Sequence, residues 1–207
     1  MESEKVQPSK IVMFDFDGVI ADSWCAQRAA FVGVLRAHGL HDFATSATFR
    51  DLLESNWFEA LLRAGVPSAV VVDIERAFGA GPVPELFPVI DEVIERLAQA
   101  YPVIVVTSSS TADVWRFLRE RQVRGVSEVI GGDVDPSKAR KIRDVRRRFG
   151  ESLEAWYVCD TVGDVAEARA AGAASIGVSW GWHGEERLLR AAPGRIARQP
   201  GELLDLL

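Results

Sequence analysis

The chain has 207 residues, of which 48% are hydrophobic, so it can form one sizeable domain with a real core, alone or with a smaller insert. Its net charge of −6 gives no electrostatic reason to expect a nucleic acid or an anionic membrane as a partner. No apolar run approaches the roughly 18 residues that span a bilayer. Met1 to Lys10 is polar, unlike a signal peptide, and two distant cysteines imply no disulfide framework, so we expect a cytoplasmic protein.

The first predicted element is a short buried strand at Ile11 to Phe14. The stretch from about Asp22 to Gly81 has apolar residues at helical spacing and no convincing strand, with residues 70–72 ambiguous. From about residue 85 onward, short apolar runs alternate with helical patterns. The strands predicted there are Val103 to Val106, Glu128 to Ile130, Ala155 to Cys159, Ala174 to Val178 and an edge strand at Arg195 to Ala197.

This alternation predicts an α/β fold, a doubly wound parallel sheet with an inserted α-helical cap. We assign residues 1–21 and 82–207 to the α/β core and residues 22–81 to the helical cap. The hinges are expected near Ile20 to Asp22 on the outgoing side and near Gly79 to Pro84 on the return side, where glycine and proline gather.

Polar side chains follow four of the predicted strands, at the edge where such sheets bind ligands. Carboxylates crowded together at this edge would repel one another, so they need a cation, and oxygen-only ligands favour Mg²⁺. Such a cation would let a phosphate approach a carboxylate nucleophile, while a hydroxyl and an ammonium hold its other oxygens. The residues are Asp15, Asp17, Thr107, Ser108, Lys138, Asp160 and Asp164.

These residues lie in motifs that resemble the haloacid dehalogenase-like hydrolase superfamily. Phe14 to Ser23 (FDFDGVIADS) is similar to its first motif, Val105 to Ser108 to its second, Lys138 to its third and Cys159 to Asp164 to its fourth. Two further segments, Glu167 to Gly172 and Ile176 to Gly181, are similar to the phosphoglycolate phosphatase-like branch, and the resemblance covers nearly the whole core.

The resemblance implies a Rossmann-like core, a helical cap that opens and closes over the substrate, and a role for each site residue. Asp15 would attack phosphorus and form an aspartyl phosphate, and Asp17 would act as general acid and then as base on water. Mg²⁺ would be held by the Asp15 carboxylate, the Asp17 backbone carbonyl and Asp160, with Asp164 supporting a water beside it. Thr107, with Ser108 beside it, and Lys138 would bind the phosphate.

Several alternatives remain open at the level of residues. Lys141 lies one turn after Lys138 and competes with it as the motif-three lysine. Cys159 stands where the family usually has glycine before the aspartate, which could shift the metal geometry. Trp182 and His183 follow a strand at the active edge and could either pack or bind. Arg50 could reach a substrate from the cap, but exposure at the surface is the favoured interpretation.

The expected function is a Mg²⁺-dependent phosphatase acting on a small phosphorylated metabolite, as a monomer or homodimer without nucleic-acid or membrane partners. One alternative is a phosphosugar mutase of the same superfamily, which returns the phosphoryl group to a second hydroxyl. A non-catalytic binding module should have lost some of the four aspartates. In dehalogenases and phosphonatases of the superfamily the second aspartate is replaced, so Asp17 argues against both.

Overall fold

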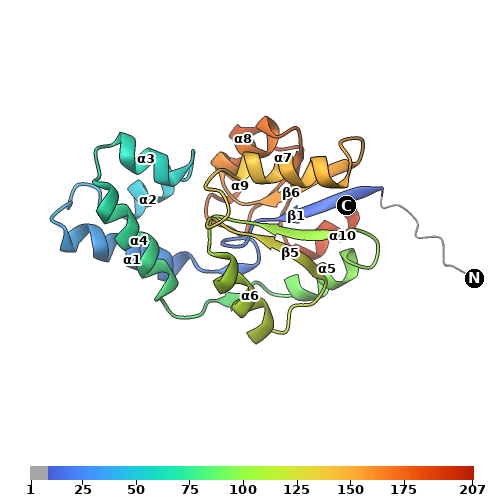
Figure 1. The fold of residues 1–207 in the computed structure, drawn as a ribbon, viewed down its shortest axis with the longest axis horizontal. Helices are drawn as coiled ribbons and strands as arrows, with labels where there is room; N and C mark the ends of the chain where they lie inside the picture. The colour runs from blue at the N-terminus through green and yellow to red at the C-terminus, as the bar shows by residue number, and fades with distance from the viewer. Residues whose placement is uncertain (1–8) are drawn as a thin grey trace, which may run out of the picture.

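The computed structural model describes residues 9–207 and has a six-stranded parallel sheet at its centre (Figure 1). The prediction for Met1 to Lys10 therefore falls almost entirely outside the described residues. The strand order is β5-β4-β1-β6-β7-β8, which confirms the predicted α/β class. The strands are β1 (Lys10–Phe14), β4 (Val103–Val106), β5 (Val126–Ile130), β6 (Glu154–Cys159), β7 (Ala174–Val178) and β8 (Arg195–Ala197).

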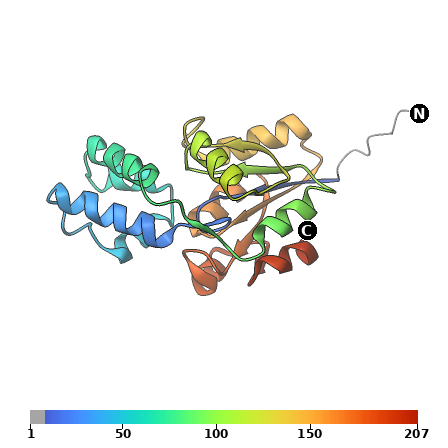
Figure 2. The ribbon, with the colours of Figure 1, turned by 90° about the horizontal axis from the view of Figure 1, so that it is seen from below.

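Helices cover both faces of the sheet (Figures 1 and 2). One layer holds α5 (Ile90–Leu97), α6 (Thr111–Glu120) and α10 (Leu203–Leu206), which follows the short 3₁₀ helix Pro200–Glu202. The opposite layer holds α7 (Lys138–Phe149), α8 (Val162–Ala170) and α9 (Gly184–Ala191). The strands are therefore apolar on both faces, as parallel strands between two helical layers must be.

Strand β1 shows how the sequence fills both layers. Its side chains point alternately to the two faces of the sheet. Val12 and Phe14 pack in the cluster with α5 and α6, and Ile11 and Met13 pack in the cluster with α7 and α8. All four are fully buried.

The order of the strands places the loop that follows β1 at the switch point of the sheet, where the direction of winding reverses. From β1 the chain adds β4 and β5 on one side, and it then returns to add β6, β7 and β8 on the other side. Loops diverge where the winding reverses, and ligands bind there, beyond the carboxyl ends of the strands. Asp15 directly follows β1 and so begins the loop at this position.

Between β1 and β4 the chain forms a helical insert of four helices, α1 (Trp24–Ala37), α2 (Ser46–Leu52), α3 (Trp57–Arg63) and α4 (Ser68–Gly79). Its interior is a separate apolar cluster that includes Phe31, Phe49, Leu61 and Ile74. The ambiguous run at residues 70–72 belongs to α4. Helix α2 ends at Leu52, and α3 begins at Trp57 with Asn56 as its N-cap.

The chain enters and leaves the helical insert through two short strands that sequence analysis did not predict. Strand β2 (Ala21–Asp22) pairs antiparallel with β3 (Glu85–Leu86), so the two crossings run side by side (Figure 2). Strands this short carry no periodicity that a sequence could reveal. The division into 1–21 plus 82–207 and 22–81 stays a prediction. Among the described residues, no helix is long and apolar enough to cross a membrane.

Candidate active site

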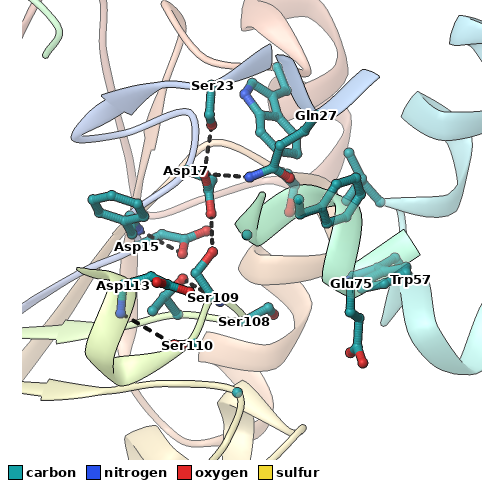
Figure 3. Close-up of a pocket in the computed structure, with 18 of the residues that line it drawn as sticks. Asp15, Asp17, Ser23, Gln27, Trp57, Glu75, Ser108, Ser109, Ser110 and Asp113 are labelled. Carbon is teal, nitrogen blue, oxygen red and sulfur yellow. Dashed lines mark hydrogen bonds between the residues drawn. The ribbon is translucent and has the colours of Figure 1, made fainter. Parts of the chain in front are cut away.

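A cavity of about 440 Å³ lies between the carboxyl ends of the strands and the helical insert. The core side of its lining includes Asp15, Asp17, Thr107, Ser108, Lys138, Asp160 and Asp164, so the structure brings all seven predicted site residues to one pocket. Figure 3 shows Asp15 and Asp17 on one side of this pocket and Trp57 and Glu75 of the insert on the other. The volume is in the range of small-molecule sites, roughly 300–1,000 Å³.

Lys138 joins two of the aspartates. Its Nζ lies 2.7 Å from Oδ2 of Asp15 and 2.6 Å from Oδ1 of Asp164. The helix starts fix this geometry: Lys138 is the first residue of α7, and Asp164 lies in the first turn of α8. Ser137 and Thr161 cap these helices by accepting backbone N–H bonds, as N-cap residues do.

The ion pair controls the charge state of the candidate nucleophile. Burial raises the pKa of Asp15 to about 7, with Lys138 opposing the rise and the nearby Asp164 adding to it. Burial by itself would lower the pKa of Lys138, but the charges of Asp15 and Asp164 outweigh this effect and hold that pKa well above its usual value. Lys138 is therefore protonated and favours an ionised Asp15.

Asp17 is held by neutral donors instead. Oδ1 accepts bonds from the Ser23 hydroxyl and the Gln27 amide, each at 2.6 Å, and Oδ2 accepts one from the Ser109 hydroxyl (Figure 3). Burial raises the pKa of Asp17, and the bonds from Ser109 and Ser23 and the charge of Lys138 oppose this only in part. A raised pKa suits a carboxyl group that must first donate a proton and later accept one.

Three of the carboxylates form a group that fits a divalent cation. One oxygen each from Asp15, Asp160 and Asp164 lies within 4.8 Å of the others, and all three residues are buried. Oδ1 of Asp160 and Oδ2 of Asp164 are buried without a hydrogen-bond partner among the described residues. Buried carboxylate oxygens without donors are costly unless a cation satisfies them, and an all-oxygen set suits Mg²⁺. The donor set therefore fits the predicted metal.

Two glycines let this group form. A Cβ on Gly18, which has φ +76°, would lie 2.0 Å from Oδ2 of Asp160, and a Cβ on Gly181 would lie 2.2 Å from the Asp160 Cβ. Only residues without side chains can surround Asp160 so closely. Cys159, the departure from the family pattern, points away into the cluster beneath α7 and α8 and is fully buried.

The two candidate lysines have different partners. Lys141 Nζ contacts the backbone carbonyls of Thr107 and Gly131, and burial lowers its pKa to about 8. It lies close to the loop after β4 rather than bonding to a carboxylate, whereas Lys138 meets Asp15 directly. Thr107 is buried, with Oγ1 accepting the N–H of Ser109, whereas Ser108 is exposed at the pocket.

His183 links the core to the helical insert. Its Nδ1 accepts the N–H of Val162, so the neutral ring carries its proton on Nε2, which donates to the carbonyl of Arg50 at 2.9 Å. The Gly163 N–H donates to the Leu53 carbonyl in the same region. The insert therefore rests on the first turn of α8, next to Asp160 and Asp164.

Sequence analysis missed parts of this site. Gln27 lies one helical turn after Ser23, and that spacing was the available signal for its contact with Asp17. Ser109 was visible only as a member of a serine run. Arg50 was expected either at the surface or as a substrate contact, and its guanidinium lies over the Trp24 ring at 4.7 Å, outside the pocket lining.

The fold and the site together define a hydrolase with an α/β core and an acidic site beneath a helical insert. The chain belongs to the haloacid dehalogenase-like hydrolase family, whose model matches residues 12–178. It is similar to a phosphoglycolate phosphatase of Synechococcus elongatus, with 25% identity over 93% of this chain and 94% of the relative. These matches confirm the predicted resemblance and the prediction of a phosphatase.

Solved structures share the fold. A haloacid dehalogenase-like hydrolase from Streptococcus pneumoniae superposes with a TM-score of 0.79 and 22% identity, covering 95% of this chain and 97% of that one. A predicted phosphatase from Clostridium acetobutylicum gives a TM-score of 0.81 and 18% identity, covering 96% and 98%. At such low identity these two structures support the fold alone.

Proposed function

We propose that the chain is a Mg²⁺-dependent phosphatase that hydrolyses a small phosphate monoester through an aspartyl phosphate on Asp15. The observation that carries this proposal is the different surroundings of two aspartates in one pocket. Asp15 bonds to the ammonium of Lys138, whereas the buried Asp17 accepts bonds from neutral donors. A neighbouring cation favours the ionised, nucleophilic form of a carboxylate, whereas a carboxyl group among neutral donors suits proton transfer.

In the first step a carboxylate oxygen of Asp15 forms a bond to phosphorus, and the bond from phosphorus to the ester oxygen breaks. Asp17 donates its proton to the leaving oxygen. In the second step Asp17 takes a proton from water, the water oxygen attacks phosphorus, and the Asp15 carboxylate is released. Thr107, Ser108 and Lys138 are proposed to bind the phosphoryl oxygens throughout.

Asp15, Asp160 and Asp164, with the backbone carbonyl of Asp17, would hold Mg²⁺. The ion supplies positive charge that offsets the repulsion between the phosphate and the carboxylates. The phosphoglycolate phosphatase relative makes phosphoglycolate one candidate substrate among small phosphate esters. The cytoplasmic location, the monomer or homodimer, and the absence of nucleic-acid and membrane partners stay predictions.

The test uses p-nitrophenyl phosphate, whose leaving group needs no acid. With Mg²⁺, the wild-type chain should release nitrophenolate and phosphate in equal amounts. Asp17→Asn should release a burst of nitrophenolate and keep the phosphoryl group on the protein, where intact mass and peptide mapping should locate it on Asp15. A phosphoryl group on another residue, or none during the burst, would contradict the proposal. A phosphosugar mutase would instead rearrange sugar phosphates without releasing phosphate.

A further inference from the structure

The pocket wall supplied by the helical insert is aromatic. Trp57 and Phe78 lie 5.8 Å apart between ring centroids, and Trp57 also contacts Phe58. All three line the pocket. They come from the start of α3 and the end of α4, so the wall is built by two helices that pack together.

Among the described residues of the helical insert that line the pocket, one is acidic and none is basic. Glu75 lies one turn before Phe78 on α4 and lines the pocket beside the aromatic rings (Figure 3). Within residues 9–207 it has neither a hydrogen bond nor an ion pair from its carboxylate. Partial burial raises its pKa.

The basic side chains elsewhere in the pocket are already engaged. Among the described residues that line it, the basic ones are Lys138 and Arg116. Lys138 is bound to two carboxylates, and Arg116 pairs with Asp113 at 2.8 Å. Glu120 also lines the pocket. The region that would receive the leaving group is therefore aromatic and negatively charged.

From this wall we infer that the leaving group of the substrate carries a positively charged nitrogen and not a carboxylate. The inference rests on the proposed phosphatase activity and specifies its substrate class: phosphate monoesters of amino alcohols. Aromatic faces and a carboxylate together bind ammonium groups, through cation–π attraction and ion pairing. A carboxylate on the leaving group would be repelled by Glu75 and would meet no unpaired basic side chain among the described residues that line the pocket.

The experiment compares two-carbon phosphate esters that differ in their terminal group: phosphoethanolamine, 2-hydroxyethyl phosphate and 2-phosphoglycolate, with phosphocholine added to test the aromatic wall. The ratio kcat/KM should fall from the ammonium to the hydroxyl to the carboxylate ester. Glu75→Gln should lower kcat/KM for the ammonium esters by about threefold to fivefold, which is what an exposed ion pair supplies. Glu75→Lys should reverse the order of the ammonium and carboxylate esters.

Glu59→Gln is the matched control, because Glu59 lies on α3, is exposed and pairs with Arg63 outside the pocket lining. It should leave the ranking of kcat/KM among the esters unchanged.

Trp57→Leu should remove any advantage in kcat/KM of phosphocholine over phosphoethanolamine. Glu59→Gln should also hydrolyse p-nitrophenyl phosphate at the wild-type rate. Two results would overturn the inference and leave the phosphatase proposal intact. One is a ranking of kcat/KM among the esters that is the same in the Glu75 variants as in the wild type, and the other is a preference of the wild type for the carboxylate ester. Failure to hydrolyse any ester would instead contradict the phosphatase proposal.

Discussion

The backbone N–H of Trp182 donates to Oδ2 of Asp160 at 2.7 Å, while the Trp182 ring packs in the apolar cluster of the helical insert. Its ring centroid lies 5.4 Å from that of Trp24 and 5.7 Å from that of Phe49. One residue of the core therefore touches both a candidate metal ligand and the interior of the insert. The position of the insert should consequently affect how well Asp160 is placed.

Trp182→Leu tests this connection. The backbone N–H remains, but the loss of ring contacts should destabilise the protein by about 2–4 kcal/mol and raise the Mg²⁺ concentration needed for half-maximal activity. Urea unfolding and a Mg²⁺ titration measure the two effects. Trp115→Leu is the control, since Trp115 packs against the core cluster around α5 and α6. If both variants share the wild-type Mg²⁺ dependence, Trp182 does not position Asp160.

Asp15→Asn should abolish turnover in a folded protein, because an amide is a poor nucleophile. It also removes one charge from a buried acidic group, so the thermal stability of the metal-free protein should hold or rise. Phosphate release and thermal unfolding are the measurements. Asp144→Asn, on an exposed face of α7 where it pairs with Arg147, should keep wild-type activity. Near wild-type turnover in a pure Asp15→Asn sample would exclude Asp15 as nucleophile.

Substitutions at the two buried lysines, Lys138 and Lys141, should have different effects on catalysis and on stability. Lys138→Met removes the cation beside Asp15 and should lower kcat/KM for every ester by about 10²–10³-fold. Lys141→Met leaves the carbonyls of Thr107 and Gly131 without their donor, and should mainly cost about 1–3 kcal/mol of stability. Kinetics and urea unfolding on both variants make the comparison. The reverse pattern would assign the phosphate contact to Lys141.

Activity should require a divalent cation. Chelation should remove turnover, and Mg²⁺ should restore it, because the carboxylate group cannot approach a phosphate dianion unaided. Ca²⁺ should bind but inhibit, since its larger and more flexible coordination shell holds the nucleophile and phosphate poorly. Metal content measured by atomic emission alongside phosphate release checks both statements. Full turnover in a metal-free sample would remove the metal assignment.

His183 should make stability depend on pH. Burial lowers its pKa, with Arg187 acting in the same direction, while the bond to Arg50 and the charges of Asp164 and Glu54 oppose the shift. The unfolded chain therefore binds a proton more readily, so the stability that His183 contributes is present above its ordinary pKa of 6.5 and is lost as the pH falls below it.

His183→Gln removes this titration. The difference in unfolding free energy between wild type and variant should shrink from about pH 7.5 to about pH 5. Urea unfolding at the two pH values measures it. A difference that stays constant across this range would show that His183 does not titrate as its burial requires.

Strands β1, β4, β6 and β7 were predictable because each is a short apolar run that is mostly buried. Strands β5 and β8 were predicted as well, although they are less buried. Sequence analysis predicted the site because polar residues gather at strand ends, where a parallel sheet brings them together. Asp15 and Asp160 are far apart in the chain but follow neighbouring strands. This reasoning needs only the order of the elements.

The parts that were not predicted depend on contacts between elements. Gln27 and Ser109 reach Asp17 from α1 and from the loop after β4, and neither position differs locally from a surface residue. The stacking of the Arg50 guanidinium on Trp24 was not predicted, because it depends on how two helices pack. The choice between Lys138 and Lys141 likewise needed the direction of each side chain on α7.

The pairing of β2 with β3 means that the chain leaves the core and returns to it at adjacent points, with Ala21 opposite Leu86 and Asp22 opposite Glu85. Two antiparallel strands can be joined by a turn of two residues. The core could therefore close on itself if residues 23–84 were replaced by a tight turn. Such a shortened chain would keep its strand order and expose the acidic pocket to larger substrates, so the fold is open to exchange of the whole insert without rearrangement of the sheet.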